Sequence, residues 1–178
     1  MDANDSQLAY VSITGTDRVG LVSATTARLF DLGANLADAS FAVLGTAFEF
    51  NAVCDLPGDT SLEEVAGQLR GLAELEGAVV SVAPFSHAAT HAENARVTHM
   101  IDVVGGDRPG LLARLTEALQ EFGANIVRMN SVRLPGLQGV QYMTRFEVYI
   151  PERRTDPCLA AIDNTAQQLA CVCRWHAV

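Results

Sequence analysis

Two short segments of the chain, residues 15–21 (GTDRVGL) and 105–111 (GGDRPGL), carry the residues best suited to bind an anion. Each segment lies between an apolar strand pattern and the start of a helical pattern. Unpaired backbone N–H groups and the positive end of the helix dipole are therefore expected to converge there. Gly20 and Gly110 have no side chain where a carboxylate would approach the main chain. The sequence predicts two sites for a carboxylate.

The same segments also allow a purely structural interpretation. Asp17 and Asp107 are placed to cap the following helices, and the glycines would then only form the turn. A nucleotide site is disfavoured, because the spacing G-x-G-x-x-G is absent and no Lys-Ser or Lys-Thr pair follows to form a phosphate loop. Because the motif is retained in two copies that differ elsewhere, the ligand interpretation and the structural one are equally favoured.

A second recurring motif, Gly-Ala-Asn, ends each helical pattern at residues 33–35 and 123–125. The glycine is expected to take the left-handed conformation just past the helix. Asn35 and Asn125 have two alternative uses, which the sequence leaves open. Each can bond the neighbouring backbone, or each can close a carboxylate site by offering a donor and an acceptor to a zwitterionic amino acid.

The spacing of these motifs results from a duplication. When residues 15–36 are shifted by 90, ten of the 22 positions are identical in residues 105–126. Apolar or weakly polar residues also recur at the spacing of one buried helix face. In the two copies they are Val22, Thr25, Leu29 and Leu32, and Leu112, Leu115, Leu119 and Phe122.

Each copy predicts the order strand, helix, strand, strand, helix, strand. The second helices are expected after the caps Asp59 and Ser61 and after Thr155 and Asp156. The second copy has a longer hairpin turn, near residues 135–138. The predicted fold class is α+β, with two ferredoxin-like βαββαβ units, antiparallel sheets and helices on one face.

The domain boundaries follow from this order. We expect a first domain over residues 1–85, a polar linker over 86–95, and a second domain over 96–178. No apolar run reaches the roughly 20 residues of a membrane span, and the acidic start MDANDSQLAY is unlike a signal peptide. These features predict a cytoplasmic protein that does not contact a membrane.

Composition excludes some functions. The chain of 178 residues is 49% hydrophobic, which is enough for packed cores, and its formal net charge of −9 would be repelled by phosphates. Direct binding to nucleic acid is therefore disfavoured. No catalytic constellation and no cofactor motif is evident, so an enzyme is not expected.

The cysteines match no disulfide framework or zinc pattern, and we expect them to be reduced core residues. An alternative metal- or redox-responsive site would combine Cys171 and Cys173 with His87 and His91 of the linker. The histidines lie among alanines, and the two cysteines do not complete a usual zinc set. No metal is therefore predicted.

Over nearly its whole length the chain resembles a tandem pair of ACT domains, small ligand-responsive modules that regulate amino-acid metabolism. The first copy, GTDRVGLVSATTARLFDLGANLADASFAVLGTAFEF, resembles in particular the glycine cleavage system transcriptional repressor group. One departure is Val19, where the second copy has Pro109. The two turns are therefore expected to differ, with the turn of Pro109 the more rigid.

The resemblance implies that modules pair side by side, joining their sheets, and bind an amino acid between the strand–helix turn of one module and its neighbour. It further implies a non-enzymatic regulatory protein, a glycine-like effector, a DNA-binding regulatory protein as partner, and a dimer or other homo-oligomer. An interaction module without a small ligand is the alternative. The expected ligand residues are Gly15, Thr16, Asp17, Arg18, Gly20, Leu21, Asn35, Leu36, Gly106, Asp107, Arg108, Gly110, Leu111, Asn125 and Ile126.

Overall fold

The computed structural model describes residues 6–88, 90–106, 108–136 and 139–178. The chain divides into two compact units, Met1–Ala89 and Thr90–Val178. Within the described ranges, no helix is long and apolar enough to cross a membrane.

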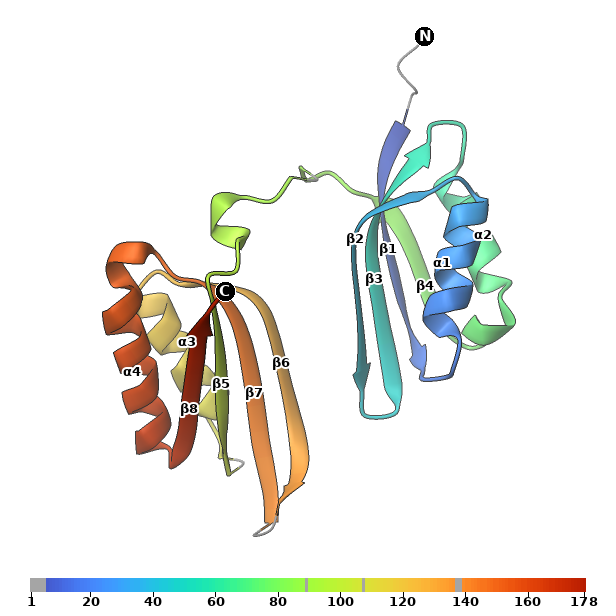
Figure 1. Ribbon diagram of the computed structural model, residues 1–178. Helices are drawn as coiled ribbons and strands as arrows, with labels where there is room; N and C mark the ends of the chain where they lie inside the picture. The colour runs from blue at the N-terminus through green and yellow to red at the C-terminus, as the bar shows by residue number, and fades with distance from the viewer. Residues whose placement is uncertain (1–5, 89, 107, 137–138) are drawn as a thin grey trace. The chain divides into compact units, whose positions relative to one another are not determined.

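The first unit is a four-stranded antiparallel sheet with strand order β2-β3-β1-β4 and both helices on one face (Figure 1). A short 3-10 turn, η1, follows the second helix. The elements are β1 (Ser6–Thr16), α1 (Leu21–Asp31), β2 (Asn35–Leu44), β3 (Ala47–Pro57), α2 (Leu62–Arg70), η1 (Ala73–Leu75) and β4 (Val79–Pro84).

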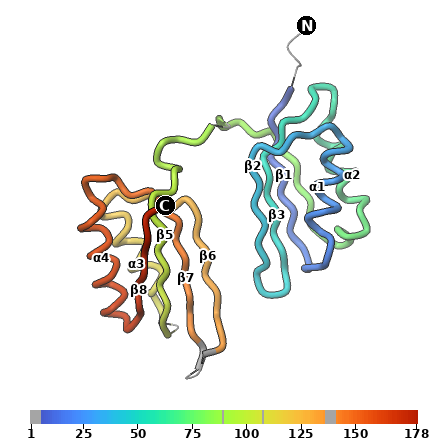
Figure 2. The backbone as a smooth tube through the Cα atoms, viewed as in Figure 1, coloured from blue at the N-terminus to red at the C-terminus, as the bar shows by residue number. Residues whose placement is uncertain are grey.

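The second unit repeats this architecture with strand order β6-β7-β5-β8, and Figure 2 traces its hairpin β6–β7 at one edge of the sheet. Its elements are η2 (Glu93–Ala95), β5 (His99–Gly106), α3 (Leu111–Glu121), β6 (Asn125–Gly136), β7 (Gly139–Tyr149), η3 (Glu152–Arg154), α4 (Thr155–Gln168) and β8 (Cys171–Ala177). The predicted fold of two βαββαβ units is confirmed. Part of the longer second hairpin turn, residues 137–138, lies outside the described residues.

Each unit has its own core between the sheet and its helices, because alternate strand residues point to the helix side. Val11 and Ile13 of β1 are fully buried in one core, and Ile101 and Val103 of β5 in the other. The opposite face of each sheet carries no helix and is called the outer face below.

The buried stripe of α1 differs from the prediction at one position. Leu21, Thr25 and Leu29 are buried, whereas Val22 is 40% exposed. The helix begins at Leu21, so positions four residues apart from Leu21 face the sheet. Val22 therefore lies on the flank of the helix, one position away from the core stripe.

The caps of the second helices are confirmed in one copy only. Ser61 Oγ accepts a hydrogen bond from the Glu64 amide at 3.1 Å and caps α2. Helix α4 instead begins at Thr155, with Arg154 at its N-cap and no side-chain cap. Thr155 and Asp156 were wrong as caps, because η3 leads directly into α4 and the chain already turns before Thr155.

Candidate ligand-binding site

Two glycines open helices α1 and α3 in a left-handed conformation. Gly20 (φ 94) and Gly110 (φ 83) are the N-cap residues, and no side chain of the described residues accepts a hydrogen bond from the first amides of either helix. The first helical N–H groups therefore have no cap from a side chain. A Cβ on Gly110 would meet no atom within 4 Å, and one on Gly20 would meet only Glu74 Cγ at 3.9 Å. The main chain of both turns is open to an approaching anion.

Asp17 does not cap α1, contrary to the prediction. Three residues separate it from the helix, and Gly20 takes the N-cap position. The Asp17 backbone N–H donates to the Thr46 carbonyl at 2.9 Å, which ties the turn to the tip of the β2–β3 hairpin. The counterpart in the second copy, Asp107, lies outside the described residues.

Arg18 anchors the first turn. Its guanidinium donates to the carbonyl oxygen of Glu76 at 2.9 Å and to that of Ala73 at 3.4 Å, both beside η1. Arg108 of the second turn makes no hydrogen bond or ion pair with another described residue. The same arginine of the repeated motif therefore anchors the turn in one copy, whereas in the other it makes no such bond within the described part of the chain.

Gly15 and Gly105 serve packing between strands. A Cβ on Gly15 would lie 2.9 Å from the Cβ of Ala78, and a Cβ on Gly105 would lie 2.9 Å from the Cα of Cys171. A side chain at either glycine would therefore point to the core side of the sheet. Gly106 differs, because a Cβ there would meet nothing within 4 Å.

Thr16 is exposed at the end of β1, opposite Ala47. The apolar residues of the predicted site support the turns from below. Leu21 and Leu111 are 2% and 3% exposed, and Leu36 and Ile126 pack against the two cores. A ligand at either turn would meet the backbone and exposed side chains, since these four side chains are turned to the core.

Asn35 lies at the far end of its sheet from the turn of the same unit. Asn35 pairs with Asp55, and Asp55 pairs with Leu8 near the start of β1, whereas β1 reaches the turn only after Thr16. Eight strand residues at about 3.3 Å each separate the two ends by roughly 26 Å. Within one unit Asn35 therefore cannot reach the turn, so a site that joins the two needs the asparagine of a neighbouring module.

The two asparagines also differ in their bonds. Asn125 Nδ2 donates to the carbonyl oxygen of Asn94 in η2 at 2.8 Å, so its amide group ties down neighbouring backbone. Asn35 is exposed, and its side chain makes no hydrogen bond with another described residue. Of the two, Asn35 has its full amide free for a ligand.

Family models of the ACT domain match residues 7–83 and residues 99–149. The chain belongs to the ACT-domain family. Its two units are ACT domains in tandem, a kind of module with a regulatory role. No curated protein matches the chain.

Two solved structures resemble the tandem ACT chain over nearly its whole length. An unknown protein from Galdieria sulphuraria is 22% identical, with a TM-score of 0.76, and the match covers 97% of this chain and 99% of that one. A protein provisionally described as a glycine cleavage system transcriptional repressor is 14% identical, with a TM-score of 0.66, covering 97% and 98%. At these identities the likeness shows a shared fold.

The first ACT domain has an exposed apolar flank along α1 and β2. It consists of Val22 and Phe30 of the helix and Phe41 and Val43 of the strand, which are 40%, 77%, 42% and 47% exposed. The second ACT domain has other residues at the equivalent positions. These are Leu112, Gln120, Ser131 and Arg133.

The cysteines of the ACT domains have the properties of core thiols. Burial raises the pKa of Cys54, Cys158 and Cys173 to about 11. Burial also raises the pKa of Cys171. His87 lies against the ring of Phe85 at 5.5 Å between ring centres. Among the described residues, no group of three His, Cys, Asp or Glu side chains is placed to hold a metal ion.

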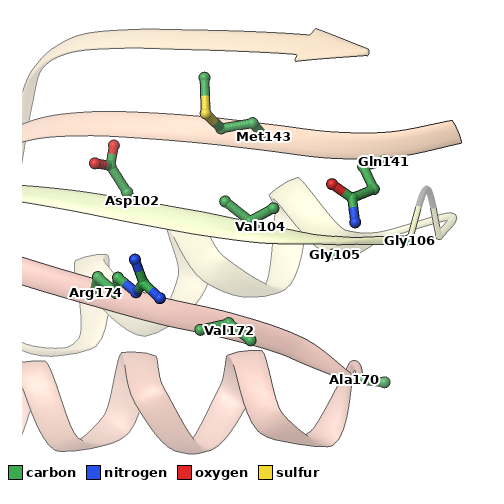
Figure 3. A pocket seen from close by; sticks show the side chains of 9 residues that line it. All are labelled: Asp102, Val104, Gly105, Gly106, Gln141, Met143, Ala170, Val172 and Arg174. Carbon is green, nitrogen blue, oxygen red and sulfur yellow. The ribbon is translucent and has the colours of Figure 1, made fainter. Parts of the chain in front are cut away.

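A cavity of about 600 Å³ lies on the outer face of the second ACT domain, and Gly105 and Gly106 at the start of the second turn form part of its lining. It extends over β5, β7 and β8 (Figure 3). Of the predicted ligand residues, Gly106 alone lines it. No motif of the sequence predicted this cavity, although the alternation of β5 could have placed Asp102 and Val104 together on the outer face.

Proposed function

We propose that the protein is a non-enzymatic regulator that binds a small amino acid between the first ACT domains of two copies of the chain. The ligand site combines the turn at residues 17–21 of one copy with Asn35 of the second copy. The position of Asn35 carries this proposal. It lies roughly 26 Å from its own turn, on an edge strand that has a free side for pairing.

Strand β2 is suited to pairing with a second copy of itself. It is an edge strand of ten residues, and Asp38 is its only charged residue. It contains no lysine or proline, which usually protect an exposed edge from pairing. Phe41 and Val43 of the apolar flank lie on β2 itself, and α1, which carries Phe30, contacts β2. The proposed joining of two first domains at this edge would bury Phe30 and Phe41.

The relative direction of the two paired β2 strands determines which residues meet at the site. A two-fold axis between β2 strands makes them antiparallel, so the first residue of one strand lies beside the last residue of the other. Asn35 of the second copy would then approach Leu44, next to Thr46. The Thr46 carbonyl already accepts the Asp17 amide at 2.9 Å. Pairing thus brings Asn35 to the turn that it cannot reach within its own copy.

The chemistry of this composite site fits the backbone atoms of an amino acid. The uncapped N–H groups at the start of α1 would bind the carboxylate, and the side-chain oxygen of Asn35 would accept from the ammonium group. Arg18, bonded to η1, would hold the turn in place before the ligand arrives. Glycine or another small amino acid is the proposed effector, in keeping with the resemblance to the repressor group.

The second ACT domain is not proposed as an equivalent pairing site. Gln120, Ser131 and Arg133 make its flank polar, and the Asn125 side chain is bonded to Asn94. This difference supports one effector site in each chain, at the turn of its first domain, and therefore two sites in a two-fold dimer.

The proposed partner is a DNA-binding regulatory protein, through which the effector modulates transcription in the cytoplasm. The net charge of −9 disfavours direct contact with DNA, so an effect on transcription would pass through another protein. The name of the structurally similar repressor is in keeping with this role.

The test combines calorimetric titration with sedimentation. Glycine, serine and the other proteinogenic amino acids would be titrated into the wild-type chain and into Asn35→Ala and Asn125→Ala. We expect weaker binding by about tenfold for Asn35→Ala, from loss of a hydrogen bond to a charged group, and little change for Asn125→Ala. No binding at millimolar concentrations would contradict an amino-acid sensor and favour an interaction module without a ligand.

The pairing is tested by giving the first domain the residues of the second. The variant Phe30→Gln/Phe41→Ser should shift the protein to a monomer in sedimentation and lose amino-acid binding. The control is Val172→Ser, which removes an exposed apolar residue from another surface. A variant that stayed dimeric and still bound the amino acid would contradict the composite site.

A further inference from the structure

The cavity on the second ACT domain has an apolar floor and polar ends. Val104 of β5, Met143 of β7 and Val172 of β8 form the floor (Figure 3). Asp102 and Arg174 stand at one end, and Gln141 stands nearer the other. Its volume of about 600 Å³ is within the range of small-molecule sites.

One cation in this cavity is uncompensated. Arg174 makes no hydrogen bond or ion pair with another described residue, and Figure 3 shows its side chain extending along β8 toward Val172. Asp102, its cross-strand neighbour, accepts from Arg145 instead, at 2.7 and 2.9 Å. The charge of Asp102 is therefore largely neutralised, while that of Arg174 faces the apolar floor.

The first ACT domain lacks these groups at the same positions of its sheet. The pair of Asp102 and Arg174 corresponds to Ser12 and Ser81. The pair of Val104 and Met143 corresponds to Thr14 and Glu49. The floor and the cation are therefore properties of the second copy and do not follow from the fold.

We propose that this cavity binds a monocarboxylate with an apolar body and no ammonium group, such as an aryl- or alkyl-carboxylic acid. The carboxylate pairs with the guanidinium of Arg174 in the bidentate geometry that arginine favours. The apolar body covers Val104, Met143 and Val172. An α-ammonium group would meet the cation Arg174, whereas both oxygens of Asp102 already accept from Arg145.

This site is separate from the proposed amino-acid site. It lies on the outer face of the second domain, whereas the proposed amino-acid site needs residues 17–21 and Asn35 of first domains. Either site can fail without the other, and the ligands differ in the ammonium group.

The test uses three probes of one skeleton. 3-Phenylpropionate, phenylalanine and 3-phenylpropanol would be titrated into the full chain by calorimetry. The backbone amide signals of Gly105 and Gly106 would be followed by NMR. We expect 3-phenylpropionate to bind and to shift both signals. Phenylalanine and the alcohol should bind at least about tenfold more weakly, since phenylalanine adds an ammonium group and the alcohol lacks the negative charge of the carboxylate.

Two variants and one control complete the test. Arg174→Gln should weaken the binding of 3-phenylpropionate by about tenfold or more. Met143→Glu, which introduces the residue found at this position of the first domain, should weaken it to the same extent. Arg153→Gln is the control, because this exposed arginine lies in η3, before the start of α4, whereas the cavity lies beyond its end. Thermal unfolding would show that each variant is folded. Absence of binding, equal binding of all three probes, or full affinity in Arg174→Gln would overturn the proposal.

Discussion

A Cβ atom on Gly105 would lie 2.9 Å from the Cα of Cys171, where β5 and β8 are paired. Real Cβ atoms do not approach a backbone carbon so closely, so a side chain at Gly105 forces the two strands apart. A Cβ atom on the next glycine, Gly106, would meet no atom within 4 Å. Two adjacent glycines therefore have opposite tolerance to substitution.

We predict that Gly105→Ala destabilises the second ACT domain by about 1–3 kcal/mol, the usual range for overpacking. Gly106→Ala serves as the control and should change the free energy of unfolding far less. Urea unfolding followed by circular dichroism measures both. Equal stability of the two variants would show that β8 can move away without cost.

A second prediction concerns one position of the repeat that holds glycine in one copy and alanine in the other. Gly77 (φ 76) and Ala170 (φ 56) both precede the last strand in a left-handed conformation. Gly77→Ala should cost about 1 kcal/mol, because a Cβ there meets no atom within 4 Å and only the backbone strain remains. Ala170→Gly relieves the same backbone strain, but it also gives the unfolded chain more conformational freedom. Because the two effects oppose each other, its free energy of unfolding should be within about 1 kcal/mol of that of wild type. A large loss of stability in Ala170→Gly would show that its methyl group packs in the folded state.

Much of the fold could be predicted from the sequence because local patterns determine it. The period of Val11 and Ile13, the helix stripe ending at Leu29 and the left-handed Gly33 all occur as expected. Val22 was misplaced because the buried stripe passes through Leu21, and the next residue lies about 100° around the helix from it. The helix start depended on Gly20 at the N-cap, a role that the sequence had given to Asp17.

The candidate site was harder to predict because it depends on which ends of the elements meet. The sequence placed Gly20 and Asn35 close together along the chain, yet α1 carries them to opposite ends of the sheet. The roles of Arg18 and Asn125 depended on carbonyl groups of Glu76 and Asn94, which no side-chain pattern reveals. Motif spacing identifies backbone turns, whereas contacts between distant segments require the register of the strands.

The ion pair between Asp102 and Arg145 predicts a dependence of stability on pH. The hydrogen bond from Arg145 is the main cause that lowers the pKa of Asp102 below its ordinary value of 3.8. A lowered folded pKa means that the stabilisation is complete above pH 3.8 and is lost as the pH falls through the folded value. Asp102→Asn should therefore be slightly less stable than wild type at neutral pH, and this difference should shrink below pH 3.8. The effect is small because the pair is partly exposed to solvent.

Urea midpoints of wild type and Asp102→Asn across this pH range would measure the difference in stability. The matched control is Arg70→Gln, which breaks an exposed ion pair with Glu63 in the first domain. A difference between Asp102→Asn and wild type that stayed constant at low pH would mean that the carboxylate does not titrate with folding.

The cysteines predict slow alkylation of the native protein. A thiol pKa raised to about 11 leaves only a small thiolate fraction at neutral pH, and burial further limits access. Iodoacetamide labelling followed by mass spectrometry should therefore be slow in the native protein and rapid at all four cysteines in denaturant. Rapid native labelling of Cys173, or stoichiometric zinc in the purified protein, would revive the metal or redox alternative.

The last prediction compares the two arginines of the repeated turn. Arg18 donates to the carbonyls of Glu76 and Ala73, whereas Arg108 makes no such bond with a described residue. Arg18→Met should lower the free energy of unfolding of the first domain by about 1 kcal/mol, the usual net value of a hydrogen bond, and Arg108→Met should change stability little. If the anchored turn binds the amino acid, Arg18→Met should also weaken that binding, because the backbone amides would have to be ordered when the ligand arrives. If Arg18→Met lowered the stability but left the affinity for the amino acid unchanged, Arg18 would stabilise the fold without contributing to ligand binding.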